Sequence, residues 1–238
     1  MKDFPEIRAL TFDVFGTVVD WRGGIAREAE AMLAPKGHAL DWGAFAVAWR
    51  EQYKPAMAQV REGRRGYVVM DLLHREMLEA ALAKFGVTTL DETEKHRLTM
   101  GWRRLDPWPD VIEGMTRLKA NFALAALSNG NIALVLAMAK RAGIPWDAIL
   151  GSQLVGTYKP DPAIYDSAPR FLDLAPREIM MVACHPWDLD AAKARGLRTA
   201  YIHRPTEWGE GTERPLPNEG EYDVIAHSFT ELAETLGV

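Results

Sequence analysis

The stretch Arg8–Thr17, RALTFDVFGT, decides how the rest of the chain is interpreted. Its first half is largely apolar, a carboxylate follows at Asp13, and Gly16 ends the run. A short apolar run bounded by a turn residue is typical of a strand that is buried on both faces, as in a parallel sheet. We therefore expect a buried strand over Arg8–Phe15 whose carboxyl end, near Asp13, turns sharply into a loop.

Strands and helices alternate after the segment Asp106–Pro109. The pattern predicts further strands over Phe122–Leu127, Ala148–Leu150, Ile179–Ala183, Thr199–His203 and Val224–Ala226. It predicts helices over Val111–Lys119, Ile132–Ala142, Ile164–Leu172, Asp188–Arg195 and Phe229–Leu236. Because such alternation with short links gives a parallel sheet, we expect an α/β fold with a doubly wound, Rossmann-like core.

A stretch with helical periodicity separates the first strand from these units. Apolar residues recur there at three-to-four spacing, over Ile25–Ala34, Phe45–Arg61, Val69–Phe85 and Glu92–Arg104. We expect residues 1–20 and 106–238 to form the core domain and residues 21–105 to form an inserted helical cap. Ligands of such sheets bind at the carboxyl ends of the strands, so we expect the cap to cover that edge.

Composition limits the partners of the chain. Its 238 residues include 28 basic and 33 acidic residues, for a net charge of −5. A protein that follows phosphates needs a basic excess, so nucleic acid is not expected as a partner. No apolar run approaches the roughly 18 residues of a membrane span, the N-terminus lacks a signal-peptide pattern, and one cysteine excludes an internal disulfide. We expect a cytoplasmic protein without a membrane partner.

Four polar segments lie where the predicted strands end. They are Asp13–Thr17 (DVFGT), Leu127–Gly130 (LSNG), Tyr158–Pro162 (YKPDP) and Val182–Asp188 (VACHPWD). Each has an ordinary explanation when it is taken alone. The acid of the first segment is a nucleophile, a metal ligand or a helix cap. The second is also common turn chemistry, the third a solvated lysine, and the last an acid at a helix N-terminus.

Together these segments are far more specific. Asp13, the pair Ser128 and Asn129, Lys159 and Asp188 follow one another in α/β units that a helical insert interrupts. This order resembles the haloacid dehalogenase superfamily of aspartate-nucleophile hydrolases over essentially the whole chain. A receiver-like signalling domain has similar strand-end residues, but it is much shorter and lacks so large a cap.

Two departures from the superfamily's phosphatase pattern indicate a particular branch. Phosphatases of this kind carry a general acid two residues after the nucleophile and a magnesium-binding acid four residues before the closing aspartate. Those positions are Phe15 and Cys184 here. Phosphoryl transfer needs both groups, whereas halide leaves carbon without a proton or a metal ion. The chain therefore resembles the 2-haloacid dehalogenase branch (type II, haloacetate dehalogenase-like), which implies no cofactor and no metal.

The resemblance assigns catalytic roles residue by residue. It implies that Asp13 attacks carbon 2 of the substrate and forms an ester. It implies that Lys159 keeps this carboxylate ionised, and that Asp188 positions Lys159 and the hydrolytic water. Ser128 and Asn129 match the pair that supports the nucleophile and the substrate.

The resemblance also implies supporting roles. Thr17 is expected to form a hydrogen bond near the nucleophile loop. Tyr165 matches a tyrosine of the same polar network, although a buried core tyrosine is the plain alternative. Phe15 is expected to form an apolar wall beside the nucleophile. Cys184 is interpreted as a small buried residue rather than as a nucleophile.

The cap is expected to supply the halide site. Arg50 lies in the second predicted helix, where the family places an arginine that faces the pocket, and a guanidinium gives directed donors to a developing anion. Arg61, Arg64 and Arg65 are the alternatives. Trp187 resembles an aromatic residue that lines the pocket, with a core or interface tryptophan as the alternative.

His185 departs from the family pattern, which often has asparagine at this position. Its side chain is expected to orient a water, to donate to the departing halide, or to cap the following helix.

The sequence thus predicts hydrolytic dehalogenation of short 2-haloalkanoic acids, haloacetates and fluoroacetate among them, through an aspartyl ester that yields a 2-hydroxy acid and halide. The alternatives are a superfamily phosphatase with an altered metal site and a non-catalytic binding protein of the same fold. By analogy, the apolar faces of the cap suggest a homodimer.

Overall fold

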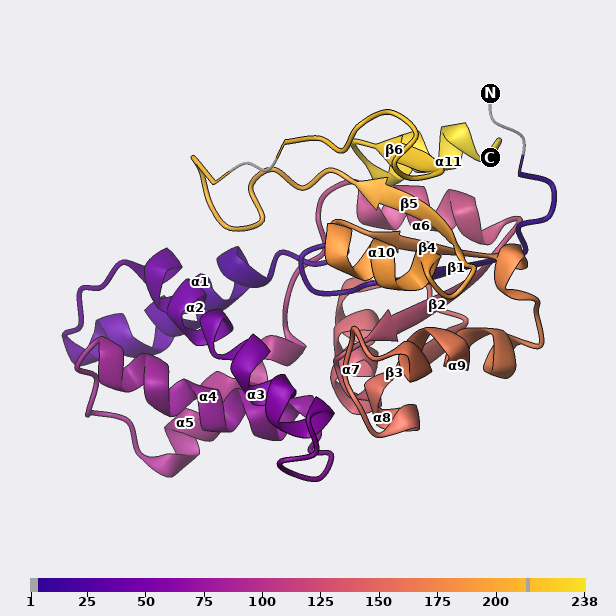
Figure 1. Ribbon diagram of the computed structural model, residues 1–238. Helices are drawn as coiled ribbons and strands as arrows, with labels where there is room; N and C mark the ends of the chain where they lie inside the picture. The colour runs from indigo at the N-terminus through magenta and orange to yellow at the C-terminus, as the bar shows by residue number, and fades with distance from the viewer. Residues whose placement is uncertain (1–3, 213–214) are drawn as a thin grey trace.

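Six parallel strands form one sheet in the computed structural model, which describes residues 4–212 and 215–238 (Figure 1). The strand order is β3-β2-β1-β4-β5-β6, and every neighbouring pair is parallel. The strands are β1 (Ala9–Phe12), β2 (Ala123–Ser128), β3 (Ala148–Gly151), β4 (Ile179–Ala183), β5 (Arg198–Ile202) and β6 (Val224–Ala226). The α/β class and the parallel sheet are therefore confirmed, although β1 is shorter than the sequence pattern suggested.

Helices cover both faces of the sheet, as a doubly wound fold requires. One face packs against α6 (Val111–Lys119), α7 (Ile132–Ala142) and α11 (Phe229–Thr235). The other packs against α9 (Pro162–Leu172) and α10 (Pro186–Lys193). The short helix α8 (Ser152–Val155) follows β3 and was not predicted, because one helical turn has too few residues to show a period.

Strand β1 occupies the centre of the sheet between β2 and β4, so its backbone is paired on both sides. Side chains alternate across a strand, which places Leu10 and Phe12 in the apolar cluster of one face and Ala9 in that of the other. Thr11 is fully buried and donates to the sulfur of Met181. Burial on both faces explains why the run is apolar without alternation.

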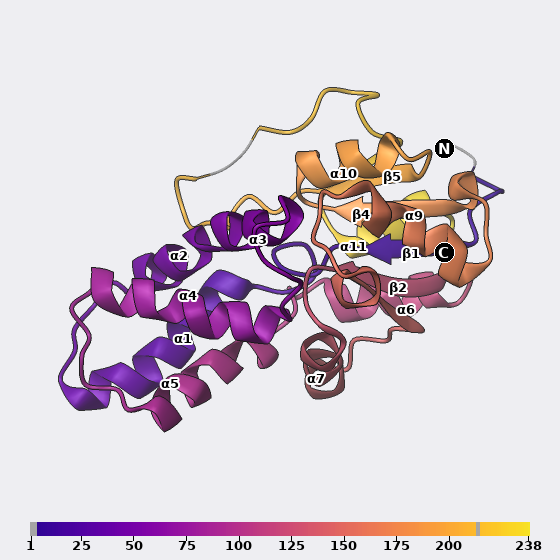
Figure 2. The same cartoon turned by 60° about the horizontal axis from the view of Figure 1, so that its bottom comes forward.

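The inserted segment forms helices that gather beside the sheet (Figures 1 and 2). They are α1 (Trp21–Leu33), α2 (Trp42–Glu51), α3 (Tyr53–Arg61), α4 (Met70–Lys84) and α5 (Glu92–Thr99), followed by the 3₁₀ turn Met100–Arg103. One prediction was wrong: Phe45–Arg61 is two helices that part at Gln52. Pro55 has no N–H to give to the carbonyl four residues earlier, and its ring clashes there, so a continuous helix is interrupted just before it.

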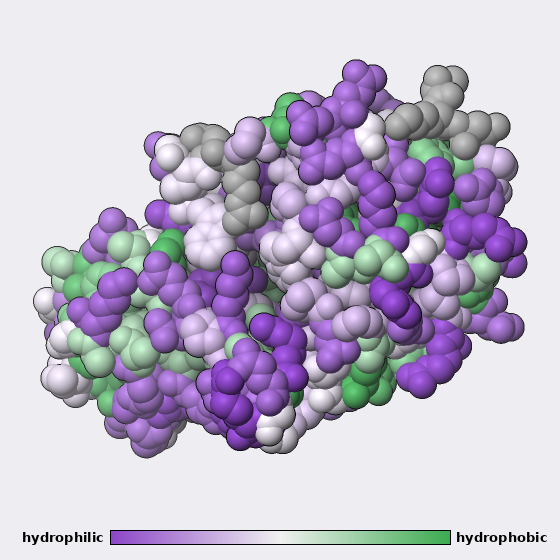
Figure 3. Space-filling model, viewed as in Figure 1, coloured by the Kyte–Doolittle hydropathy of each residue, from purple (hydrophilic) through white to green (hydrophobic). Residues whose placement is uncertain are grey.

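Hydrophilic side chains dominate the face shown in Figure 3, and apolar residues form only small patches on it. Among the described residues, no helix combines the length and the apolar character that a membrane crossing requires.

An ion pair fixes the loop that follows β1. The guanidinium of Arg204 donates to both carboxylate oxygens of Asp110 at 2.8 and 3.0 Å, and its Nε donates to the backbone carbonyl of Thr17. Asp110 also accepts the backbone N–H of Phe229 at the start of α11. Burial raises the pKa of Asp110, but Arg204 and the backbone N–H outweigh burial and leave that pKa below its usual value. This clamp joins two helices to the segment that carries Asp13.

We predict that Asp110→Asn lowers the free energy of unfolding at pH 7 by about 3 kcal/mol, because the buried Arg204 loses its charged partner. The folded-state pKa of Asp110 is lower than in the unfolded chain. Its contribution is therefore present above about pH 4 and is lost as the pH falls through the folded-state pKa. Urea unfolding across this range should show the two proteins converging in acid. Asp166→Asn, in an exposed pair with Arg195, is the control and should change stability by less than about 1 kcal/mol. An equal loss in both variants would contradict the clamp.

Candidate active site

A pocket of about 740 Å³ lies between the cap and the carboxyl ends of the strands. Helices α2 and α3 supply one wall, and core loops supply the other. The lining side chains used below are Arg50, Tyr53, Arg61, Lys159, His185, Trp187 and Trp208. Helices of the inserted segment thus line the pocket at this edge of the sheet, while the division of the chain into a core domain and a cap stays a prediction.

Asp13 lies one residue beyond β1, and its side chain accepts hydrogen bonds from three others. Its Oδ2 atom receives Thr17 Oγ1 and His185 Nδ1, each at 2.9 Å. Among the described residues, the one hydrogen-bond partner of its Oδ1 atom is the Lys159 ammonium, at 3.4 Å. The expected hydrogen bond of Thr17 is present, and Oδ1 is the less encumbered oxygen of the carboxylate.

Lys159 connects Asp13 to a second buried acid. Its ammonium donates to Asp188 Oδ2 at 2.6 Å, and the Tyr165 hydroxyl donates to the other oxygen of Asp188 at 2.6 Å. Lys159 and Asp188 are fully buried. Tyr165 therefore belongs to the polar network, as the resemblance implied. Asp188 contacts Lys159 as expected, whereas its positioning of a water stays a prediction.

The oppositely charged groups of this network shift one another's pKa toward the ionised form. Burial lowers the pKa of Lys159, but Asp188 and Asp13 reverse this effect and raise it. Burial also raises the pKa of Asp13, and here the charge of Lys159 with the contacts of His185 and Thr17 prevails and holds that pKa far below its usual value. Asp13 is thus ionised at every physiological pH, as a nucleophile must be.

Ser128 and Asn129 shape the loops around Asp13. Asn129 Oδ1 accepts the backbone N–H of Lys159 at 2.8 Å and the Ser152 hydroxyl at 3.0 Å, while Ser128 Oγ accepts the backbone N–H of Gly130. Gly151, at φ +125°, lies so close to this turn that an added Cβ would be 2.0 Å from the Ser128 carbonyl oxygen. A contact of either residue with substrate stays a prediction.

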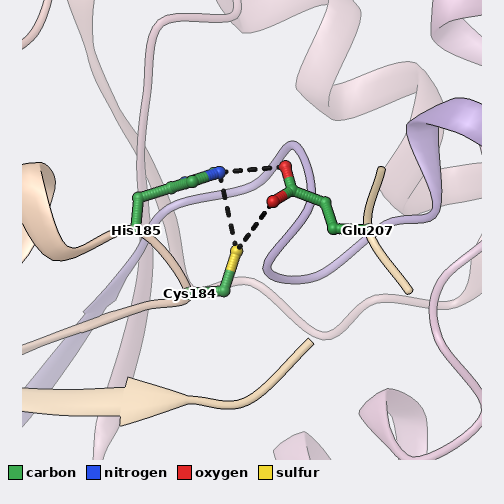
Figure 4. Close-up of side chains that lie close together, drawn as sticks. All are labelled: Cys184, His185 and Glu207. Atoms are coloured by element: carbon green, nitrogen blue, oxygen red, sulfur yellow. Dashed lines mark hydrogen bonds and ion pairs between the residues drawn. The ribbon is translucent and has the colours of Figure 1, made fainter. Parts of the chain in front are cut away.

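His185 is held between two carboxylates, one of which sequence reasoning missed. Its Nδ1 faces Asp13, and its Nε2 lies 2.9 Å from Oε1 of Glu207 (Figure 4). Glu207 also accepts the indole N–H of Trp21 at 3.1 Å. His185 occupies the N-cap position of α10 without a capping side-chain hydrogen bond, so the expected capping role is wrong. Glu207 comes from the long loop after β5, where the only signal was a carboxylate in a Pro- and Gly-rich segment.

The protonation of His185 follows from these neighbours. Burial lowers its pKa, but Cys184, Glu207 and Asp13 raise it well above the usual value. Burial raises the pKa of the Cys184 thiol and keeps it neutral, so the two carboxylates are the lasting anions. His185 is therefore an imidazolium that donates both ring protons.

Arg50 brings a buried positive charge to the pocket. Its guanidinium carbon lies 3.8 Å from the ring centre of Tyr53 and 5.4 Å from that of Phe15. Phe15 itself is buried and packs edge-on against Trp102. Within the described part of the chain, the buried Nη1 of Arg50 has no hydrogen-bond partner. A desolvated cation with a free donor is suited to an anion.

The other arginines weighed for this role lie elsewhere or are occupied. Arg61 lines the pocket but donates to the backbone carbonyl of Lys159. Arg64 pairs with Gln59 and Glu62, and Arg65 pairs with Glu76. Of the four, Arg50 alone combines a place in the pocket lining with the free buried donor found among the described residues.

Trp187 lines the pocket and stacks on His185, with ring centres 5.7 Å apart. It is 37% exposed, so the alternative of a core tryptophan is wrong.

An ionised aspartate at the end of a central parallel strand, beneath an inserted cap, defines an aspartate-dependent α/β hydrolase. A model of the haloacid dehalogenase-like hydrolase family matches residues 7–196, and the chain belongs to this family. It is 33% identical over 238 residues to (S)-2-haloacid dehalogenase 1 of Pseudomonas sp. (strain CBS-3), with 96% of this chain and 94% of the relative covered.

Solved structures agree with this assignment. An L-2-haloacid dehalogenase matches with a TM-score of 0.91 and 48% identity, covering 97% of this chain and 98% of its own. A defluorinating L-2-haloacid dehalogenase matches with a TM-score of 0.94 and 43% identity, covering 100% of this chain and 99% of its own.

We predict that Lys159→Gln lowers the free energy of unfolding by about 3 to 5 kcal/mol at pH 8, because Asp13 and Asp188 lose their shared cation. Burial already raises the pKa of Asp188, and without Lys159 this pKa rises further while that of Asp13 is no longer held low by the lysine. Stability should then fall as the pH increases through the raised values. The deficit should be smaller at pH 5 in urea unfolding. Lys193→Gln, an exposed lysine bonded to the Glu221 carbonyl, is the control. A deficit independent of pH would contradict the charge argument.

Proposed function

We propose that this chain, a 2-haloacid dehalogenase that hydrolyses carbon–halogen bonds, acts on short 2-haloalkanoic acids through an ester formed on Asp13. One observation carries the proposal: the carboxylate of Asp13 is ionised and has one weakly bonded oxygen, in a site where Arg50 has a free buried donor. A nucleophile and a hydrogen-bond donor for the departing anion are the two groups that halide displacement requires.

The hydrogen bonds of Asp13 give its two carboxylate oxygens different roles in the reaction. Oδ1 is the attacking atom, because Oδ2 is engaged by Thr17 and His185. Attack on carbon 2 forms a C–O bond and breaks the carbon–halogen bond, and the halide leaves with the electron pair. Oδ2 then becomes the carbonyl oxygen of the ester. When water attacks the carboxyl carbon, Thr17 and His185 donate to the negative charge that develops on Oδ2.

The phosphatase alternative is disfavoured by the surroundings of Asp13. Phe15 stands at the position of the phosphatase acid, buried among aromatic rings. Cys184 stands at the position of the magnesium-binding acid, and magnesium prefers oxygen ligands. A non-catalytic binding protein would not need Asp13, Lys159 and Asp188 in a charge network of this cost.

Haloacetates, including fluoroacetate, are the substrates that we propose. The aromatic rings around Arg50 exclude water, and a directed N–H in a dry site favours the small fluoride ion most, because its charge is the most concentrated. The relative described as defluorinating, at 43% identity, supports this choice. The absence of a nucleic-acid partner, a homodimer and a cytoplasmic location also remain our proposals; gel filtration tests the homodimer.

We predict that Asp13→Asn abolishes halide release while leaving the fold intact. A single turnover of the wild-type chain in heavy-oxygen water should place the label in Asp13 rather than in the product, because water attacks the acyl carbon of the ester. Mass spectrometry of the peptide that contains Asp13 measures this outcome. Label in the first product molecule would mean that water attacks carbon 2 directly, and the ester would be excluded.

We predict that Arg50→Ala slows ester formation about a hundredfold, or roughly 3 kcal/mol, while it changes substrate binding far less. The halide is an anion only in the transition state, so the guanidinium stabilises that state selectively. Single-turnover kinetics with chloroacetate and fluoroacetate measure the rate, and fluoroacetate should lose more. Arg64→Ala, in a pair outside the pocket lining, is the matched control. Normal rates for Arg50→Ala with both substrates would exclude Arg50 as the halide donor.

A further inference from the structure

Cys184, His185 and Glu207 bring three possible metal-ligand atoms together beside the active site. Sulfur, imidazole nitrogen and carboxylate oxygen point toward one another from two loops (Figure 4). Within residues 4–212 and 215–238, no other group of three or more His, Cys, Asp and Glu side chains has its ligand atoms within 4.8 Å of one another. All three residues are buried, and neither the attack on carbon 2 nor the ester hydrolysis uses the thiol.

The separations of these atoms suit a small four-coordinate cation. His185 Nε2 lies 3.6 Å from Cys184 Sγ and 2.9 Å from Glu207 Oε1, and Cys184 Sγ lies 3.9 Å from Glu207 Oε2. Bonds of about 2.0 Å to nitrogen and oxygen and about 2.3 Å to sulfur, at tetrahedral angles, separate the ligands by roughly 3.3 to 3.6 Å. The observed separations lie on both sides of this range, so a shift or rotation of the Glu207 carboxylate that places one oxygen toward both Nε2 and Sγ completes three of the four ligand positions.

The surroundings already orient each ligand. Metal-binding histidines usually donate their second ring N–H to a carboxylate, and His185 Nδ1 does so to Asp13. The indole of Trp21 holds the Glu207 carboxylate. Gly16 makes room for it, because an added Cβ there would lie 2.3 Å from Glu207 Oε1.

We propose that Cys184, His185 and Glu207 bind a divalent cation of the zinc class, and that this binding inhibits the enzyme. The mixed sulfur, nitrogen and oxygen ligands favour zinc or cobalt and disfavour magnesium. Cys184 binds as the thiolate and Glu207 as the carboxylate, so these two ligands balance the two charges of the ion. A divalent ion in a buried site is costly unless its charge is balanced in this way.

Inhibition follows from the position of the ion. An ion bound to Nε2 fixes the imidazole of His185, whose Nδ1 donates to Asp13 Oδ2, and it also fixes Glu207. His185 then cannot adjust its hydrogen bond as charge develops on Oδ2 during ester hydrolysis. The inhibitory role rests on the proposed function, whereas the binding of the cation does not.

Cobalt titration of the full chain tests the site directly. Cys184 is the one cysteine of the sequence, so a cobalt–thiolate charge-transfer band can arise only from it. We expect one equivalent of Co²⁺ to produce this band together with tetrahedral visible bands, Zn²⁺ to abolish them, and Mg²⁺ to have no effect. Cys184→Ser should lose the thiolate band, and Glu207→Gln should bind at least about tenfold more weakly. Glu210→Gln, an exposed acid of the same loop, should bind as the wild type does.

Halide release provides the second measurement. Saturating Zn²⁺ should lower turnover of the wild type at least about tenfold, EDTA should restore it, and Cys184→Ser should keep basal turnover and resist Zn²⁺. Cobalt bands without any dehalogenation would refute the proposed function and leave the site intact. A missing thiolate band, or equal binding by the wild type, Cys184→Ser and Glu207→Gln, would overturn the site. Thiolate bands without Zn²⁺ inhibition would overturn the inhibitory role.

Discussion

The ionised carboxylate of Asp13, buried at the end of the central strand, is the constraint on which the rest of the site depends. A buried anion is costly unless charges and donors compensate it. Lys159 supplies the compensating charge, but its own burial then requires Asp188. His185 supplies a second charge and requires Glu207 in the same way. The buried charge of the nucleophile therefore requires partners from the segments that follow β3, β4 and β5 as well as from its own loop after β1.

The sequence predicted those site residues that directly follow a recognisable strand, because the geometry of a parallel sheet then brings them together. Asp13, Ser128 and Asp188 follow apolar runs, and parallel strands all end at one edge, so their proximity could be inferred without coordinates. Glu207 could not be found in this way, because it lies in an irregular loop whose path depends on tertiary contacts such as the one with Trp21. The division of Phe45–Arg61 into two helices could have been predicted from Pro55, which interrupts a helix. It was missed because the apolar spacing continues across the break without a change.

The pocket belongs to neither part of the chain alone. The apolar cluster on one face of the sheet continues into the cap, where it includes Trp21, Trp49 and Trp102 as well as Phe15 of the nucleophile loop. Hydrogen bonds also cross the boundary, from Arg61 to the Lys159 carbonyl and from the Tyr158 hydroxyl to the Val68 carbonyl. Because Arg50 sits in this shared cluster, its charge is kept away from water by residues of both parts.

The central place of β1 has a consequence for the order of assembly. Ala9 pairs with Ala123 on one side and with Ile179 on the other. The first strand can therefore pair only after segments more than a hundred residues later in the chain have been synthesised. Closing such long loops is slow, whereas the helices between them make mostly local contacts. During synthesis the cap segment can gain structure while the strand that bears the nucleophile is still unpaired. The hydrogen-bond network of the site is complete only after Glu207 has been synthesised, so Asp13 leaves the ribosome long before the site around it is assembled.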